Sequence, residues 1–500
     1  MHQKTLIGAA VWVSVIGLGI AACNNGDDEV VQVNSGVVIQ NVTVVNTRDG
    51  SLAGGAAVVI DGGKIQRIVG NNAIRVGSSV QTVDGTGKYV VPGFLDMHTH
   101  TLDAADATPT KWPLLIANGI TGVREMTGSA ASVQRARQLN ADSAAGKVDA
   151  PEILLIPGEI FGGELVGQPP IAGSSSAVAA VAEVQKQKAY GAGFVKNVRS
   201  TRDATLAMLT EAKNQGIDVA GHLSPSVGGK ESSDNGWKAI EHLGGGLTIL
   251  LDCSSNEDSI RTSVVAGAAI AQFRQSILDT YDDAKCQSLA RTFAANKTWH
   301  VPTLIKLRTG LVTNDPAYVG DPNLVYVSKT LRASWAAAAQ NFGLANDATS
   351  AARLQRYFSL QQTMPKLFKQ NGVKMLAGSD TATGPAFVIP GFSLHQEFKL
   401  LAGAGLTPLD ILLMTTLNGA EFLGRQATMG TVEEGKNADL VLLDANPVAD
   451  VANLDAISGV FLKGRYFSKV ALDKLKSDVA AAYAVQPAGI GSGVDKAHVD

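Results

Sequence analysis

Short apolar runs alternate with helical patterns over about two thirds of this 500-residue chain, and this alternation restricts the fold more than any other feature. Strands that alternate with helices are joined by right-handed crossovers and form a parallel sheet. Eight such strands predict an α/β protein with a (β/α)8 barrel, the TIM-barrel form. The eight strand-like runs cover residues 91–100, 120–126, 152–158, 194–198, 217–223, 239–245, 300–305 and 373–380.

Further strand signals flank the barrel pattern, which we place at residues 93–427. Residues 36–92 contain short β-runs, and Asp61-Gly62-Gly63 between two apolar runs predicts a hairpin. Strand signals return in residues 428–475. We expect these two segments, from the N- and C-terminal parts of the chain, to build one small β-sandwich domain. Residues 476–500 are rich in Ala, Gly and Ser and are expected to form a tail.

Two long insertions interrupt the regular spacing of the barrel. Residues 251–297 include an amphipathic helical pattern over 264–278, and residues 309–370 hold a loop with Pro and Gly followed by more helix. Loops that follow barrel strands build the active face, so both insertions are candidate lids or specificity elements. Decoration without substrate contact is the alternative.

Side chains suited to metal chemistry lie at five of the eight strand ends. His98 and His100 are at i and i+2 in a strand, so their side chains share one face. Taken singly, such residues are more often core histidines, ion-pair lysines or helix N-caps. Together they predict one site at the C-terminal face of the barrel. The strand ends carry His98 and His100 (first), Lys196 (fourth), His222 (fifth), His242 (sixth) and Asp380 (eighth).

The segments HTH, VKNV, AGH, IEH and GSD, in this order, resemble the amidohydrolase superfamily. With VPGFLDMHTH before them and EEGKNADLVLLD after them, they are most similar to its imidazolonepropionase-like and prolidase-like lipoproteins, over about residues 36–470. The resemblance implies two divalent metal ions, and imidazole with oxygen ligands favours Zn²⁺. It places His98, His100 and Asp380 on one ion, His222 and His242 on the other, and Lys196, carboxylated by CO₂, between them.

The same resemblance implies a hydrolase. A hydroxide bridging the metals would attack a carbonyl carbon, and Asp380 would be the catalytic residue that takes the proton and returns it to the leaving nitrogen. The expected substrate is a small-molecule amide, dipeptide, cyclic amide or N-acyl amino acid. Arg124, Arg199 and His395 are candidates for substrate binding. The segment after Lys196, NVRSTRD, is more basic than the family pattern predicts.

Two other functions stay open. A mononuclear deaminase of the same superfamily would share His98, His100, His242 and Asp380, but it would not need Lys196. Metal content separates it from the binuclear hydrolase. A catalytically inactive surface-binding lipoprotein would be expected to have lost at least one ligand, and all six are present.

The first 23 residues have the pattern of an export signal. Lys4 precedes an apolar run over residues 6–22, and Ile20-Ala21-Ala22-Cys23 resembles a bacterial lipobox, in which the cysteine is lipidated. Residues 24–35 would be a flexible tether. An uncleaved membrane helix is the alternative, but the run is short for one. We therefore expect an exported lipoprotein, periplasmic or anchored in the outer membrane, that meets the membrane only through its lipid.

The net charge argues against a nucleic-acid partner, and the cysteine count predicts a disulfide. The formal net charge is -3, without the basic patch that a nucleic-acid partner usually requires. Besides Cys23 the chain has Cys253 and Cys286, and an even pair in an oxidising compartment favours a disulfide over two separate thiols. A homo-oligomer is compatible with the sequence.

Overall fold

The computed structural model describes residues 30–104, 106–162, 173–312, 315–341, 348–381 and 387–485. The expected export signal, Cys23 and residues 24–29 of the expected tether lie outside these residues, as do residues 486–500 of the expected tail. The other half of the tether is not a free linker, because residues 31–33 form strand β1.

Parallel strands form the central sheet. Hydrogen-bonded ladders join three strands in the order β10-β9-β8 and five in the order β11-β12-β13-β14-β15. A parallel bridge between Pro157 and Phe194 connects the two groups, because the chain beyond β10 runs alongside β12. The strands are β8 (Phe94–Thr99), β9 (Ile120–Glu125), β10 (Glu152–Leu155), β11 (Phe161–Gly162), β12 (Phe194–Arg199), β13 (Asp218–Gly221), β14 (Ala239–Glu241) and β15 (Trp299–Val301).

The eighth barrel position is occupied by residues 373–381, which differ from the predicted regular strand. They form only isolated parallel bridges, from Met375 to His300 and from Thr381 to Thr99. Backbone hydrogen bonds on both sides still hold the segment in the sheet: Leu376 N–H donates to the His300 carbonyl and Asp380 N–H to the His98 carbonyl, both at 2.9 Å. With these contacts each of the eight positions has two neighbours, and the predicted (β/α)8 fold is confirmed.

Helices cover the outside of the sheet, and apolar side chains fill its inside. The interior cluster comprises Leu95, Met97, Met126, Phe194, Ala220, Ala239, Trp299, Val301 and Leu376. These residues close the barrel below the ends of the strands, so that polar groups concentrate at the rim. The main outer helices are α1 (Trp112–Ala117), α2 (Ala130–Ala144), α3 (Ala177–Tyr190), α4 (Arg202–Gln215), α5 (Gly229–Asp234), α16 (Phe392–Gly403), α17 (Pro408–Met414) and α18 (Leu417–Phe422).

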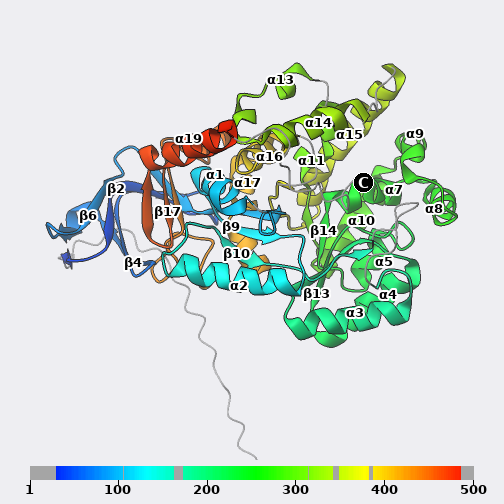
Figure 1. Cartoon of the computed structure of the whole chain (residues 1–500), viewed down its shortest axis with the longest axis horizontal. Coiled ribbons are helices and arrows are strands. Elements are labelled where there is room, and N and C mark those ends of the chain that lie inside the picture. The colour runs from blue at the N-terminus through cyan, green and yellow to red at the C-terminus, as the bar shows by residue number, and fades with distance from the viewer. Residues whose placement is uncertain are drawn as a thin grey trace, which may run out of the picture.

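A second sheet at one end of the molecule combines strands from both ends of the described chain (Figure 1). Its strand order is β18-β17-β16-β7-β2-β3-β4, with β6 paired to β2, and a separate two-stranded sheet joins β1 and β5. The predicted hairpin joins β3 and β4, where Gly62 and Gly63 both have positive φ, as a tight turn requires. The strands are β1 (Val31–Val33), β2 (Val37–Val45), β3 (Leu52–Asp61), β4 (Lys64–Gly70), β5 (Ile74–Val76), β6 (Gln81–Asp84), β7 (Tyr89–Pro92), β16 (Leu440–Leu443), β17 (Ile457–Leu462) and β18 (Arg465–Ser468).

Both insertions are helical. The first lies at the end of the barrel opposite the second sheet, and the second runs along one side of the barrel towards the C-terminal helix (Figure 1). The helical pattern predicted over residues 264–278 is broken, because Gly267 adopts a φ of 100° that ends the first helix. The first insertion contains α7 (Thr248–Asp252), α8 (Glu257–Val265), η3 (Ile270–Phe273), α9 (Arg274–Asp279) and α10 (Asp283–Asn296). The second follows α11 (Leu304–Leu307) and contains α12 (Thr309–Val312), α13 (Pro316–Val319), η4 (Pro322–Tyr326), α14 (Lys329–Asn341) and α15 (Ala348–Gln370).

A C-terminal helix, α19 (Lys469–Val485), runs past residue 475, where we expected the tail to begin. Val479 and Tyr483 on this helix are buried, and the Tyr483 hydroxyl donates to Asp106 at 2.6 Å. Asp106 lies in the loop that follows β8, so the last helix braces the first loop of the active face. Among the described residues, none of the helices is both long enough and apolar enough to span a membrane.

Candidate metal centre

The strand ends bring the predicted ligands to one rim of the barrel. Every residue of β8 is buried, and its end presents His98 and His100 on one face. His242 directly follows β14, and Asp380 ends the eighth segment. His98, His242 and Asp380 offer ligand atoms that all lie within 4.8 Å of one another, and all three are buried.

The backbone at this rim adopts conformations that ordinary side chains avoid. His242, Thr303 and Asp380 have φ angles of 52°, 42° and 59°, in the left-handed region that favours glycine. Such strained residues persist where the surrounding structure fixes them, and they concentrate at functional sites. The turn at His242 also lets two successive residues, Glu241 and His242, both point into the barrel.

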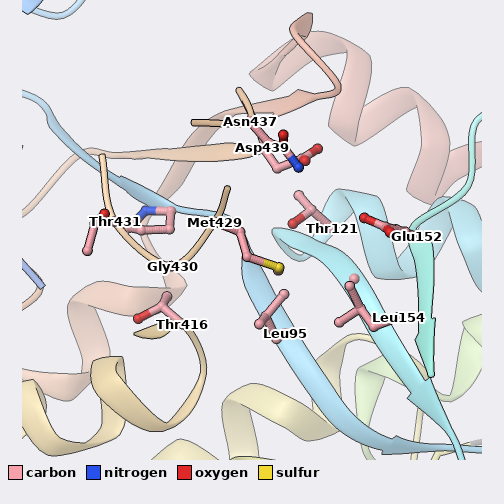
Figure 2. Close-up of a pocket in the computed structure, with 13 residues that line it drawn as sticks. Leu95, Thr121, Glu152, Leu154, Thr416, Met429, Gly430, Thr431, Asn437 and Asp439 are labelled. Atoms are coloured by element: carbon pink, nitrogen blue, oxygen red, sulfur yellow. The ribbon is translucent and has the colours of Figure 1, made fainter. Parts of the chain in front are cut away.

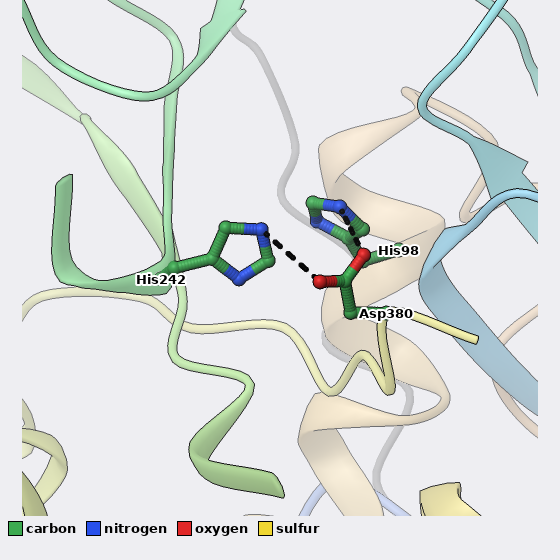
Figure 3. A group of neighbouring side chains, drawn as sticks. All are labelled: His98, His242 and Asp380. Carbon is green, nitrogen blue, oxygen red and sulfur yellow. Dashed lines mark ion pairs between the residues drawn. The ribbon is translucent and has the colours of Figure 1, made fainter. Parts of the chain in front are cut away.

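Three imidazoles converge on one carboxylate, and two of them are drawn in Figure 3. The Nε2 atoms of His98 and His100 lie 3.2 and 3.0 Å from Asp380 Oδ1, and Nε2 of His242 lies 3.7 Å from Oδ2. Figure 3 shows His98 and His242 on two sides of the Asp380 carboxylate. A divalent cation takes this set of nitrogen and oxygen donors.

The other nitrogen of each ring is held by a neighbouring side chain. Nδ1 of His100 lies 2.6 Å from the Thr127 hydroxyl. Nδ1 of His242 contacts Oγ1 of Thr303, whose hydroxyl donates to the Pro302 carbonyl, so that its oxygen accepts from the ring. Proteins orient metal-binding histidines in this way, and the arrangement leaves Nε2 facing the centre.

His222 and Lys196 lie on neighbouring strands of the same rim. Lys196 pairs with Ala220 in the β12–β13 ladder, and the His222 ring centroid lies 5.0 Å from that of His242. Lys196 is 1% exposed and lies close enough to lower the pKa of the His98 ring. The structure thus brings all six predicted ligands to the same end of the barrel.

Burial and local charge favour the protonation states that a metal requires. Burial lowers the pKa of His98, and burial together with the cation of Lys306 takes that of His242 well below the ordinary value. Burial alone would raise the pKa of Asp380, but Lys306 and the histidines hold it well below the usual range. The rings of His98 and His242 are therefore neutral and the Asp380 carboxylate is ionised, and donors in these forms bind cations.

Lys196 has a perturbed amine. Burial lowers its pKa to about 8, although the negative charges of Glu241 and Asp380 oppose the shift. Near neutral pH about a tenth of the Lys196 side chains are therefore neutral amines, far more than for an ordinary lysine, and this form is the one that can react with CO₂.

Sequence reasoning missed several residues that shape the site. Glu241 holds His98, Thr303 holds His242, and Nζ of Lys306 lies 3.5 Å from Asp380 Oδ2. Glu241 could have been found, since it stands beside a ligand in the IEH segment. Lys306 belongs to a short helix after β15, and no sequence pattern marks it.

The three residues predicted to bind substrate lie in three different parts of the barrel. Arg124 is completely buried and lies inside the barrel, where it pairs with Glu241. His395 lies between Asp455 and the Asn118 carbonyl, 2.7 and 2.9 Å from its two nitrogens, near the second sheet. The backbone of Arg199 ends β12 opposite Gly162 of β11.

Cys253 and Cys286 form a disulfide in the first insertion, with their sulfur atoms 2.10 Å apart. The bridge joins the end of α7 to α10 and lies away from the ligand set.

A pocket at the opposite end of the barrel lies where the strands begin (Figure 2). Leu95, Thr121 and Glu152 line it from the barrel, and Met429 and Asp439 line it from the segment that leads into the second sheet. This end of a (β/α)8 barrel serves stability, and catalysis takes place at the other end.

Comparisons with known proteins agree with this geometry. The model of the amidohydrolase family matches residues 324–466. An imidazolonepropionase of Mesorhizobium japonicum is 24% identical over 75% of this chain and 82% of its own length. An imidazolonepropionase of Thermoplasma volcanium is 30% identical over 21% of this chain, and the match spans only 27% of that protein.

Solved structures share the fold. Bottromycin amidohydrolase superposes with a TM-score of 0.69 at 19% identity, over 90% of this chain and 91% of its own. A putative prolidase from Bifidobacterium longum gives 0.59 at 20% identity, over 89% and 99%. At these identities the likeness shows that the chain shares the fold of these proteins. Residues 324–466 are thus similar to the amidohydrolase family, in agreement with the resemblance found in the sequence.

Proposed function

We propose that this protein is a binuclear metal-dependent hydrolase that cleaves a carbon–nitrogen bond in a small amide, a dipeptide or an N-acyl amino acid. The observation that carries the proposal is the convergence of three imidazoles on the Asp380 carboxylate, with Lys196 and His222 at the same rim.

The donor set fits two cations better than one. His98, His100 and Asp380 would hold one ion, and His222 and His242 the other. The Lys196 ammonium cannot ligate, but its carbamate would supply one anionic oxygen to each ion. The buried Nε2 of His98 supports a cation at this position, because it has no well-aligned hydrogen-bond partner among the described residues. Zn²⁺ is the ion that this mixture of nitrogen and oxygen favours.

When bound, such ions supply a nucleophilic hydroxide at neutral pH and polarise a carbonyl oxygen. The chain's own residues do the rest. Asp380 is ionised, so it can take a proton from the attacking water and give it to the leaving nitrogen. An amine is a poor leaving group without that proton, which is why an amide is the natural substrate.

Lys306 supports a substrate with a carboxylate. Its side chain is partly exposed, and its ammonium reaches the edge of the ligand set, 3.5 Å from Asp380. A cation in this position would attract the carboxylate of a dipeptide or an N-acyl amino acid.

A screen of the purified, Zn²⁺-loaded protein against dipeptides and N-acyl amino acids tests the proposal, with release of free amine as the readout and Lys196→Ala as the blank. We expect hydrolysis that depends on CO₂ and two metal equivalents per chain. One equivalent, no CO₂ dependence and release of ammonia would instead identify a mononuclear deaminase. Two equivalents without amine release from any compound would contradict the proposed activity.

We further propose that the protein is exported and anchored by a lipid on Cys23, as the lipobox-like segment suggests. Detergent phase partition of the protein from bacterial cells tests this. The native protein should enter the detergent phase, and Cys23→Ala should remain in the aqueous phase. Equal partition of both would contradict lipidation.

A further inference from the structure

A completely buried carboxylate lies directly behind one of the site histidines. Glu241 ends β14, immediately before His242, and its Oε2 accepts a hydrogen bond from Nδ1 of His98 at 2.7 Å. Its other oxygen, Oε1, accepts from the Arg124 guanidinium, also at 2.7 Å. The carboxylate therefore joins two strands, β8 and β14, that are not neighbours in the barrel.

Arg124 completes this connection from β9. Its Nε donates to the carbonyl of Met97, the residue before His98, at 2.6 Å. The guanidinium also lies over the rings of Phe194 and Phe422, 5.7 and 5.3 Å from their centroids. A planar fork with several donors can contact a carboxylate and a carbonyl at once, whereas a lysine ammonium is a single point.

The arrangement fixes the tautomer of His98. An ionised carboxylate only accepts hydrogen bonds, so Nδ1 of His98 must carry the proton. The lone pair of this ring is then on Nε2, which faces Asp380. Contact with the Met97 carbonyl also fixes the backbone from which the His98 side chain projects.

We propose that Glu241 and Arg124 are positioning residues for His98, and that they set the affinity of the metal centre by holding this ring in its ligating tautomer and orientation. The inference rests on the metal centre of the proposed function. It assigns Arg124 a role inside the barrel in place of the substrate contact expected from the sequence.

A second carboxylate–arginine ion pair, partly exposed and at the opposite end of the barrel, provides the control. Glu152, the first residue of β10, pairs with Arg425 through contacts of 2.8 and 3.2 Å. It lies where the strands begin, so the loss of its charge should leave the centre unaffected.

The experiment measures Zn²⁺ binding by competition with a chromophoric chelator and metal content by mass spectrometry, for wild type, Glu241→Gln and Glu152→Gln. We expect Glu241→Gln to bind Zn²⁺ about 10- to 100-fold more weakly, which is the usual effect of losing a partner of a metal-bound histidine. Glu152→Gln should bind as wild type does. Equal affinity of wild type and Glu241→Gln would overturn the proposal, even if the variant were less stable.

A double variant distinguishes the loss of His98 positioning from a loss of folding stability. Arg124→Met or Glu241→Gln alone leaves one buried group without its partner, which costs stability. The double variant Arg124→Met with Glu241→Gln has no charge at either position, so no buried charge is left unpaired. It should therefore unfold at a higher denaturant concentration than Arg124→Met alone. It should still bind Zn²⁺ weakly. Recovery of wild-type affinity in the double variant would overturn the proposal. If wild type itself bound no Zn²⁺, the proposed function would fail instead.

Discussion

Glu397 gives a prediction about pH and stability next to the metal centre. This residue of α16 is completely buried, and its Oε2 accepts a hydrogen bond from Ile305 N–H at 2.7 Å. Ile305 stands between Thr303, which holds His242, and Lys306, which reaches Asp380. Burial raises the pKa of Glu397 to about 8, although the hydrogen bond opposes the shift.

The raised pKa of Glu397 determines whether its contribution to the unfolding free energy rises or falls with pH. The folded protein holds the proton of Glu397 more tightly than the unfolded chain, whose carboxyl has a pKa near 4.5. The resulting stabilisation is fully present below that value and is lost as the pH rises towards about 8. Between about pH 5 and pH 7.5 the loss amounts to roughly 3 kcal/mol, taking about 1.4 kcal/mol per pH unit.

Glu397→Gln removes the titration and keeps an oxygen that can accept from Ile305. The unfolding free energy of the variant, compared with wild type, should therefore improve by roughly 3 kcal/mol from about pH 5 to about pH 7.5. Urea unfolding at both pH values, with fixed Zn²⁺ and an intact disulfide, measures this difference. Glu211→Gln is the control, because hydrogen bonds from Gln185, Gln215 and Asn214 lower the pKa of Glu211, and its contribution should not change in this range. A difference for Glu397→Gln that is the same at both pH values would refute the reasoning.

Four further predictions concern the site and the first insertion. Asp380→Asn should lower kcat for amide hydrolysis by at least about 100-fold, because the proton acceptor is lost; steady-state kinetics of amine release check this. Lys196→Ala should lower the Zn²⁺ content from two equivalents to one or fewer, as measured by mass spectrometry of the desalted protein. Lys306→Met should raise KM about tenfold for N-acyl amino acids and leave KM for their amides unchanged, since only the former carry the carboxylate. Replacing both Cys253 and Cys286 by Ala should lower the unfolding free energy by about 4 kcal/mol in urea, from the chain entropy of a loop with a sequence separation of 33 residues.

The fold was predictable because periodicity and turn residues report local structure. Seven of the eight expected strands are present, and the spacing between His222 and His242 leaves room only for the short helix α5. The eighth strand was expected to be regular, yet residues 373–381 form only bridges. In this segment tertiary contacts with β8 and β15 determine the backbone, and a sequence pattern does not contain them.

The clustering of the six candidate ligands was predictable for a similar reason, because parallel strands end at one rim. The groups that hold the ligands were not. The pairing of Glu241 with His98 and Arg124 joins strands separated by more than 100 positions in the chain. Side chains that meet across the inside of a barrel leave no periodic signal. In the sequence Arg124 therefore looks like a substrate-binding arginine, and its complete burial is evident only in the structure.

The mixed origin of the second sheet has a consequence for synthesis of the chain. β7 pairs with β2 on one side and with β16 on the other, and the barrel begins at the next residue but one. During translation the edge of β7 that pairs with β16 stays unpaired for on the order of tens of seconds, while the ribosome synthesises the whole barrel. An unpaired strand edge is prone to join the wrong partner. The nascent chain thus needs protection at β7 until β16 has been synthesised. Truncation before residue 440 should leave the edge of β7 unpaired and the protein prone to aggregation.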